Sequence, residues 1–223
     1  MFWMNRNARR KRPNDLLYSF KNFLDILQNK KGHKKASLLM HTDPNDPEGP
    51  NLFAVAEMLG IKDNVVFSNQ RVDFQTINVL HNISDVCINI SYAEGFGLST
   101  LEAMQTATPI IAPMTGGQTR QVINAYTGEE NGVALPIKVK TLVGSQSVPY
   151  IFEDMVDTAD VTAAMYKMYD LGPEERNNLG NKAREYAISE FGYQKVIDLW
   201  NDTLLKTIME FKYNKKNFTV TEL

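Results

Sequence analysis

Residues 86–104 are VCINISYAEGFGLSTLEAM, and this stretch decides the fold. Its first part, Val86–Ile90, is a nearly continuous apolar run, which is expected of a strand buried on both faces of a sheet. Gly95 and Gly97 follow, and glycine lets the backbone turn tightly or approach a ligand closely. Leu98–Gln105 predicts a helix. A buried strand that leads through a glycine turn into a helix is a building unit of α/β proteins.

The rest of the chain repeats this alternation of strand and helix. The expected strands lie at residues 1–5, 36–41, 65–67, 86–90, 109–112 and 132–135, and the expected helices at 15–28, 52–59, 74–82, 98–105 and 118–124. Such alternation predicts an α/β fold: a single Rossmann-like domain with a parallel sheet of about six strands and helices on both faces. Ligands of such sheets bind outside the carboxyl ends of the strands.

The last third of the chain departs from this rhythm. Within residues 137–154, the runs 139–143 and 148–152 predict an inserted hairpin around Gly144-Ser145. Residues 157–213 are expected to be helical, with breaks at Gly172-Pro173 and Gly192, because glycine and proline interrupt helices. We therefore expect one domain over residues 1–213 and a polar tail over 214–223. Three aromatic residues follow helical spacing and are expected in the core: Phe191, Tyr193 and Trp200.

Composition excludes several classes of protein. The chain has 223 residues, 43% of them hydrophobic and 22% charged, as in ordinary globular domains. Its net charge of −2 gives no reason to expect nucleic-acid binding. The single cysteine, Cys87, fits a reducing compartment and is expected in the core. We find no secretory signal and no apolar run of about 20 residues, so we expect a cytoplasmic protein without a membrane span.

The glycine turn carries the candidate chemistry. The first amides of the expected helix lack internal partners and lie at its positive end, so they suit a phosphate group. Ser99 and Thr100 could add hydroxyl donors. The carboxylate of Glu102 accepts hydrogen bonds and suits sugar hydroxyls, whereas Glu94 could meet the group attached to the phosphate. A lone glycine turn would more often be a packing feature, but two glutamates eight positions apart favour a binding site.

The EGFG…LEAM string, with Glu94 and Glu102 in an E-x7-E arrangement, resembles the GT-B glycosyltransferases of glycosyltransferase family 4. Further matches extend along most of the chain: Arg6 and Lys11 at a spacing of five, Val65–Phe67 with Arg71 and Val72, Ser84–Val86, Thr108–Ala112, Gly116-Gly117, and 181–191. The resemblance implies the C-terminal, donor-binding half of a GT-B fold. It also implies a retaining hexosyltransferase without an essential metal, which agrees with the lack of a D-x-D sequence.

The resemblance also implies a role for each matching residue. Arg6 and Lys11 would clamp the diphosphate, Glu102 would bind the ribose, and Glu94 would act on the sugar, either as a positioning group, which we favour, or as a nucleophile. Arg71 and Val72 would contact the base. The expected donor-binding residues are thus Arg71, Val72, Gly95, Phe96, Gly97, Leu98, Ser99, Thr100 and Glu102, and the expected catalytic residues are Glu94, Arg6 and Lys11. The donor would be a UDP-, GDP- or ADP-sugar, with no permanently bound cofactor.

Alternatives to these assignments remain open. The basic residues Arg6, Arg9, Arg10, Lys11 and Arg12 could form a solvated loop or, less favoured, a nucleic-acid patch. The acidic loop at residues 43–48 is interpreted as a turn rather than a metal site. His33, His41 and His81 are expected to have surface or core roles. Arg120 stands near the place where the family often has glutamate, which puts the sugar contacts of that loop in doubt.

Two functions fit the sequence. The family has two Rossmann-like domains, the acceptor-binding one first, and this chain begins at the first strand of the second. The chain could be the donor half of a transferase. It could instead be a non-catalytic module that needs an acceptor domain on a separate chain. Its possible protein partners are therefore such an acceptor-domain chain or, in a homo-oligomer, further copies of itself. Residues 137–154 are longer than the family's usual connection, which suggests a partner surface or a tolerated insertion. The E-x7-E arrangement argues against an epimerase or a phosphorylase.

Overall fold

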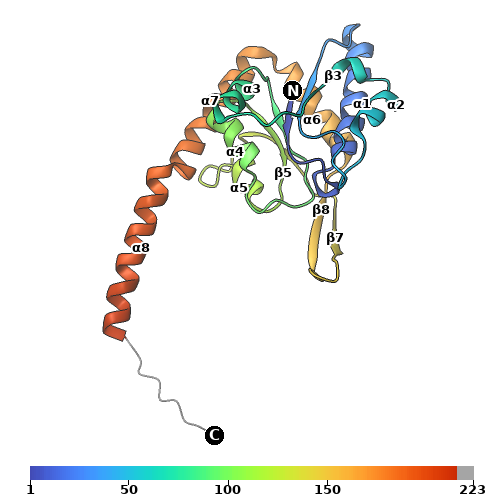
Figure 1. Cartoon of the computed structure of the whole chain (residues 1–223). Helices are drawn as coiled ribbons and strands as arrows, with labels where there is room; N and C mark the ends of the chain where they lie inside the picture. The colour runs from blue at the N-terminus through green and yellow to red at the C-terminus, as the bar shows by residue number, and fades with distance from the viewer. Residues whose placement is uncertain (215–223) are drawn as a thin grey trace.

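The computed structural model describes residues 1–214, and its centre is a parallel sheet of six strands (Figure 1). The strand order is β3–β2–β1–β4–β5–β6, the order of the Rossmann fold. The strands are β1 Phe2–Met4, β2 Leu38–His41, β3 Val65–Ser68, β4 Cys87–Ile88, β5 Ile110–Pro113 and β6 Gly132–Leu135. All neighbouring pairs are parallel, so the predicted α/β class and sheet are confirmed.

Helices cover both faces of the sheet, as the alternation predicts. They are α1 Pro13–Lys31, α2 Leu52–Met58, α3 Phe74–Asn82, α4 Leu98–Gln105, α5 Gln118–Val122, α6 Thr158–Asp170 and α7 Gly172–Phe191, whereas the last helix, α8 Tyr193–Asn214, extends away from the sheet (Figure 1). Phe2 and Trp3 are adjacent in β1, so their side chains point to opposite faces. Trp3 packs with α1, α2 and α6, whereas Phe2 packs with α4, α5 and α7. The two hydrophobic cores therefore lie on opposite faces of the sheet.

Local sequence sets the ends of the helices. The side chains of Asn51 and Asp73 accept hydrogen bonds from backbone amides at the starts of α2 (3.0 Å) and α3 (2.8 Å), as N-cap residues do. α1 begins at Pro13, two residues before the expected start, because proline is favourable in the first helical turn. α5 ends earlier than expected because Ile123 forms an antiparallel bridge with Glu130.

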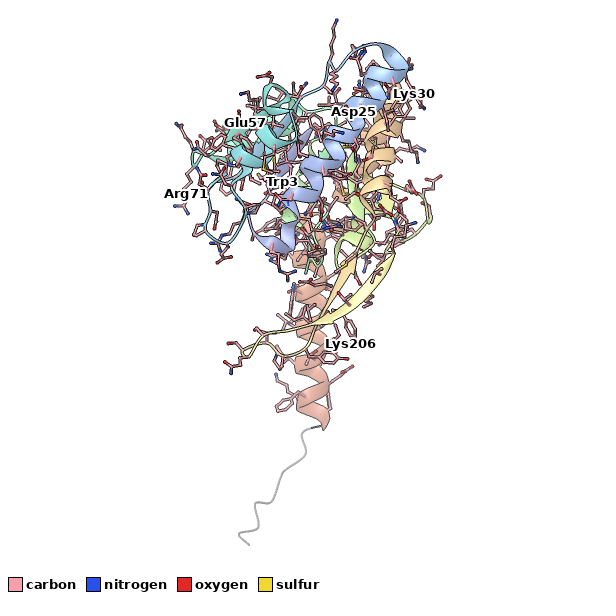
Figure 2. All side chains as sticks on the ribbon, turned by 90° about the vertical axis from the view of Figure 1, so that its right-hand side faces the viewer. Trp3, Asp25, Lys30, Glu57, Arg71 and Lys206 are labelled. Carbon is pink, nitrogen blue, oxygen red and sulfur yellow. The ribbon has the colours of Figure 1, made fainter. Side chains whose placement is uncertain are left out.

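The expected hairpin is present, but its second strand was misplaced. β7 is Val139–Val143 as predicted, whereas β8 is Ile151–Met155 rather than residues 148–152. The turn is longer because Ser145 donates its backbone N–H to the carbonyl oxygen of Val148 at 2.8 Å, and Pro149 has no N–H for a strand ladder. The hairpin projects from the body of the molecule (Figures 1 and 2).

The expected burial of the aromatic residues near the C-terminus is wrong for two of three. Tyr193 is 82% exposed and Trp200 is 63% exposed, because α8 extends away from the sheet and helices (Figure 1). Phe191 alone packs inward, with its ring edge-on to Phe96 at 5.5 Å. None of the helices within residues 1–214 is long and apolar enough to cross a membrane. The predicted tail began at residue 214, but Asn214 is the last residue of α8, and the rest of the tail, from residue 215 onward, lies outside the described residues.

The packing of α1 against α6 makes a prediction about stability. Phe20 is fully buried in the core between these helices and the sheet. Phe20→Ala should lower the free energy of unfolding by about 3–5 kcal/mol, because the truncated side chain leaves a cavity. Tyr18→Ala, in the same helix but half exposed, should cost at most about 1 kcal/mol. Urea unfolding followed by circular dichroism measures both, and equal losses would contradict this packing.

Candidate functional site

Three loops meet at the carboxyl ends of β1, β4 and β5. The order of strands reverses between β1 and β4, and such switch points are where Rossmann-like sheets bind ligands. The backbone N–H of Tyr92, after β4, donates to the carbonyl oxygen of Arg10, after β1, at 2.9 Å. The N–H of Gly117, after β5, donates to the carbonyl oxygen of Glu94 at 3.1 Å. The structure thus brings the sequence-predicted residues of these loops together.

Glu94 is the most connected of these side chains. Its carboxylate forms an ion pair with Lys11, and the hydroxyl of Ser91 donates to it at 3.2 Å. The guanidinium of Arg10 is 3.9 Å away. The pairing of Lys11 with Glu94 joins two of the three predicted catalytic residues. The third, Arg6, instead pairs with Asp46 (2.7 Å) and Glu48 (3.0 Å) in the loop after β2.

Burial affects the charge of Lys11. It lowers the pKa of this ammonium group from 10.5 to about 8, and the positive charge of Arg10 adds to the effect. The carboxylate of Glu94 acts in the opposite direction, because a neighbouring anion favours the charged amine. Lys11 is therefore a buried cation whose charge depends on its partner, and an incoming anion would favour the charged form in the same way.

The turn before α4 has a backbone that depends on glycine. Gly97 has φ of 92°, and a Cβ there would lie 2.8 Å from the hydroxyl of Thr100. At Gly116 a Cβ would lie 2.0 Å from the carbonyl oxygen of Glu94, so this glycine lets the β5 loop pack against the glutamate. Because α4 begins at Leu98, its first amides have no partner within the helix and lie at its positive end.

The hydroxyl of Thr100 does not serve as the expected donor. Thr100 is fully buried, and its hydroxyl donates to the carbonyl oxygen of Gly97 at 2.8 Å and contacts the side chain of Gln121. This bonding leaves only the backbone N–H of Thr100 for a ligand. Ser99 is also buried, whereas Leu98 and Phe96 are exposed. The turn therefore presents backbone groups and apolar side chains more than hydroxyl groups.

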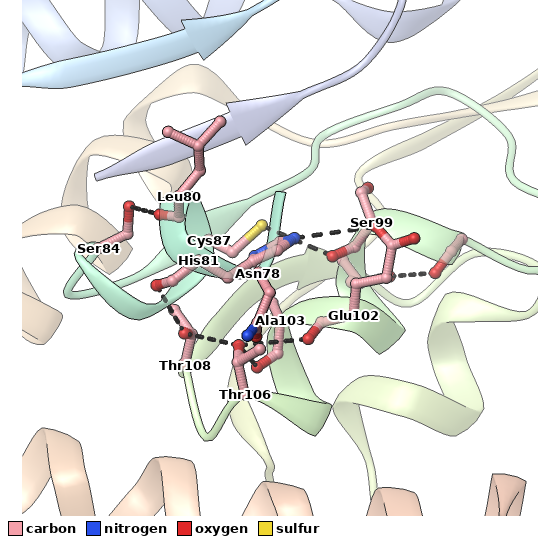
Figure 3. Close-up of polar contacts among 12 residues, drawn as sticks. Asn78, Leu80, His81, Ser84, Cys87, Ser99, Glu102, Ala103, Thr106 and Thr108 are labelled. Atoms are coloured by element: carbon pink, nitrogen blue, oxygen red, sulfur yellow. Dashed lines mark hydrogen bonds and ion pairs between the residues drawn. The ribbon is translucent and has the colours of Figure 1, made fainter. Parts of the chain in front are cut away.

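Glu102 and Arg71 lie farther from the glycine turn. The side chain of Glu102 is 35% exposed, and its Oε2 lies 3.8 Å from Nε2 of the buried His81 (Figure 3). Arg71 and Val72 are on the loop between β3 and α3, and Arg71 extends into solvent (Figure 2). Within residues 1–214, no ion pair or hydrogen bond joins Arg71 to Glu94 or Glu102. Among the described residues, Arg71 thus has no direct polar contact with either glutamate, and its contact with the base stays a prediction.

Comparison with known proteins decides the family. The family model for glycosyl transferases group 1 matches residues 2–138, which is more than half of the chain. The chain belongs to the glycosyl transferases group 1 family. This membership confirms the resemblance to the GT-B glycosyltransferases. The family match covers the whole parallel sheet and all three loops of the candidate site, and it ends directly before β7.

Individual relatives agree with the family. The chain is 30% identical over 151 residues to MMP alpha-(1->4)-mannosyltransferase of Mycolicibacterium hassiacum, which covers 68% of this chain and 31% of that one. Its fold is similar to sucrose-phosphate synthase from Thermosynechococcus elongatus, with TM-score 0.69, 23% identity, and coverage of 93% and 45%. Anabaena HepE in complex with UDP gives TM-score 0.69, 15% identity, and coverage of 92% and 48%. The chain thus spans about a third of the curated relative and about half of each solved structure.

The hairpin of this glycosyltransferase chain, which lies beyond the family match, is anchored at the candidate site. Arg9 forms a two-pronged ion pair with Glu153 of β8, with distances of 3.1 and 2.5 Å. The backbone N–H of Asp154 donates to the carbonyl oxygen of Tyr92 at 2.8 Å, and the hydroxyl of Thr115 donates to the Asp154 carboxylate at 2.6 Å. Sequence reasoning missed these contacts because the partners are far apart in the chain.

Two more residues lie in α5, the helix that follows the loop after β5. Gln118, directly after Gly116-Gly117, is fully buried beside Gly97, and both polar atoms of its side chain lack a partner in residues 1–214. Its place after two glycines was the available signal. Arg120 forms an ion pair with Glu190 of α7. The same described residues contain no cluster of His, Cys, Asp or Glu that could hold a metal ion.

The basic residues after β1 mostly have acidic partners. Arg6 pairs with the loop after β2, Arg9 with β8, and Lys11 with Glu94, while Arg12 pairs with Asp15 at 2.7 Å. These carboxylates offset much of the positive charge that a nucleic-acid surface would need. The cluster is therefore a set of local ion pairs around the switch point.

The lowered pKa of Lys11 predicts a pH-dependent stability. The folded protein releases this proton near pH 8 and the unfolded chain near its ordinary value of 10.5. Between these values the unfolded chain binds more protons, so the contribution of Lys11 to the free energy of unfolding increases with pH. The free energy of unfolding of the wild type minus that of Lys11→Met should therefore increase between pH 8 and 10. Urea titrations at several pH values measure it, with the exposed Lys35→Met as the control. A constant difference would mean that Glu94 keeps Lys11 charged.

Proposed function

We propose that this chain is the donor-binding domain of a retaining glycosyltransferase of glycosyltransferase family 4. It would transfer a hexose from a nucleoside diphosphate sugar to an acceptor. The observation that carries the proposal is the buried Lys11–Glu94 ion pair beside the glycine turn at the start of α4. This arrangement combines a cation, a carboxylate and free helix amides at the switch point of the sheet, where a sugar diphosphate has both charged and hydroxyl groups to be bound.

Charge stabilisation is the proposed role of Lys11 and the α4 amides. Breaking the bond between the anomeric carbon and the diphosphate leaves negative charge on the departing group. Donors already held in place around that charge stabilise the transition state without reorganisation. Lys11 and the first amides of α4 are such donors. Arg6 would join them by exchanging Asp46 and Glu48 for a phosphate, since these partly exposed pairs cost little to break.

The two glutamates would divide the rest of the donor between them. Glu102, in the second turn of α4, would accept hydrogen bonds from the ribose hydroxyls, and Arg71 with Val72 would contact the base. Glu94 would position the sugar rather than attack it, because its carboxylate is already engaged by Lys11 and Ser91. The similar fold of Anabaena HepE in complex with UDP supports a nucleoside diphosphate as the ligand class. The donor would be a UDP-, GDP- or ADP-sugar, and the single free cysteine favours a cytoplasmic setting.

Calorimetry with paired ligands tests this division of roles. UDP, GDP, ADP and their glucose or mannose derivatives are titrated into the folded chain, and the tightest pair is kept. Glu102→Ala should weaken the nucleoside diphosphate and its sugar equally, by about 10-fold or more, because hydrogen bonds to a charged group contribute about 1.5–3 kcal/mol. Glu94→Ala should weaken mainly the sugar-bearing ligand.

The control for these variants is Glu57→Ala, which removes an exposed carboxylate of α2. It should leave both affinities unchanged. If no ligand of the panel binds the folded wild type, the proposed function is wrong. If Glu94→Ala and Glu102→Ala affect both ligands alike, donor binding stands but the division of roles does not.

We propose as a second candidate a binding module that works with an acceptor-binding domain on another chain. The observation in its favour is the apolar surface of α8, which projects from the body (Figure 1). Its exposed apolar residues include Val196, Ile197, Trp200, Leu204, Ile208 and Phe211. Their spacing of three and four residues aligns them on one side of the helix. An apolar stripe of this length is typical of a surface that another protein covers.

A turnover assay separates the two candidates. The isolated chain is incubated with the nucleoside diphosphate sugar that binds it, and the release of nucleoside diphosphate is measured with and without simple sugar acceptors. If the chain is a binding module, it should bind the sugar nucleotide without turnover, because the groups that bind the acceptor would come from an acceptor-binding domain on another chain. Turnover by the isolated chain, abolished by Lys11→Met but retained by Trp200→Glu on α8, would favour a self-sufficient enzyme.

A further inference from the structure

A buried histidine faces the carboxylate proposed to bind the ribose. Nε2 of His81 lies 3.8 Å from Oε2 of Glu102 (Figure 3). Oε2 is buried, and neither it nor the ring nitrogens of His81 have a hydrogen-bond partner within residues 1–214. Buried polar atoms in folded proteins are nearly always paired. A donor and an acceptor that are both unpaired and face each other therefore need only a small movement to bond.

The imidazole is the fixed member of this pair. His81 is 1% exposed, near the C-terminal end of α3, and its ring lies edge-on to Phe2 of β1 with centroids 4.9 Å apart. Its carbonyl oxygen accepts a hydrogen bond from the hydroxyl of Thr108 at 3.0 Å and another from the backbone N–H of Ser84, also at 3.0 Å. These contacts hold the backbone and the ring, so the position of Nε2 is set by the core and not by the solvent.

Glu102 is the adjustable member. Its side chain is partly exposed, yet one carboxylate oxygen is buried against the histidine, so the exposed part presents the other oxygen. The negative charge of Glu102 also acts on its surroundings: after burial, it is the next contribution that raises the pKa of the Cys87 thiol, to about 12. A carboxylate fixed through one oxygen presents the other in a single direction, which favours one arrangement of hydroxyl groups.

We propose that His81 is a positioning residue for Glu102: its Nε2–H donates to Oε2 and orients Oε1 toward the ribose of the donor. This inference rests on the proposed function, in which Glu102 binds the ribose. An imidazole suits the role because Nε2 carries a hydrogen in one neutral tautomer and in the protonated ring. A purely apolar aromatic residue would fill the same space against Phe2 but would leave Oε2 unpaired.

The test uses a ligand that lacks the groups Glu102 would bind. Affinities for the preferred nucleoside diphosphate and for its 2′,3′-dideoxy form are measured by calorimetry, and their ratio reports the ribose contact. The wild type should prefer the natural ligand, and Glu102→Ala should abolish the preference. His81→Phe should reduce the ratio by about 10-fold, since a charge-assisted bond is lost, without weakening the dideoxy ligand. His81→Gln keeps an N–H donor and should restore most of the ratio.

The control variant is Thr108→Val, which removes the hydrogen bond to the His81 carbonyl without touching the ring. It should leave the ratio unchanged. A wild type that binds neither ligand would contradict the proposed function itself. If Glu102→Ala abolishes the preference and His81→Phe keeps it, the proposed function stands and the inference about His81 is wrong. Equal weakening of both ligands by His81→Phe would likewise contradict the inference, because it would mean that His81 acts only as a packing residue of the core.

A second measurement does not depend on the folding of a His81 variant. The Nε2–H of His81 is observed by ¹⁵N NMR in the wild type and in Glu102→Ala. A hydrogen bond to Oε2 should move this resonance when the carboxylate is removed, whereas Glu57→Ala should leave it in place. An unchanged resonance in Glu102→Ala would overturn the proposal.

Discussion

The ion pair between Lys11 and Glu94 is the interaction on which the site depends. Two charges removed from water are stable only if their geometry is good and their remaining hydrogen-bonding groups are satisfied. Here the loops after β1, β4 and β5 supply that geometry through backbone hydrogen bonds and through the close approach of Gly116 to Glu94. The strand order places these three loops side by side. The parallel sheet, the short strands and the glycine turns together hold this buried charged pair in place at the carboxyl ends of the strands.

Structural features that depend on residues close together in the chain were predicted well from the sequence. The bounds of α3 follow from its capping residue Asp73 and from apolar spacing, and α4 begins directly after the glycine turn, which was identified from its composition. Contacts between distant segments were harder. Arg6 matches the family pattern but pairs with Asp46. Arg9 pairs with Glu153 of the hairpin, whose strands were predicted but whose docking against the loop after β1 no local pattern could give. The hydroxyl of Thr100 was predicted to donate to a ligand. Its actual partner, Gln121, was not foreseen because the two residues are distant in the chain and become neighbours only in the fold.

Two elements beyond the family match, the hairpin β7–β8 and α8, project from the body of the molecule (Figure 1). The hairpin β7–β8 begins where the family match ends, and it is tied to the candidate site at its base. α8 carries a long apolar surface that the described residues leave uncovered. Helical spacing predicted α8 correctly but not its exposure, because spacing shows which side is apolar and not what covers it. Trp200 illustrates the difference: its position in the stripe was clear, but its burial depends on a partner.

The most direct test of the account is to locate a bound nucleoside diphosphate by amide chemical shifts. The isotope-labelled chain is titrated with the tightest of UDP, GDP and ADP, and shifts are followed residue by residue. The account predicts the largest changes at Gly97, Leu98 and Ser99, with smaller ones at Lys11 and Glu102. Changes confined to the opposite edge of the sheet, around Asp85, would contradict it, as would a ligand that binds without affecting the start of α4.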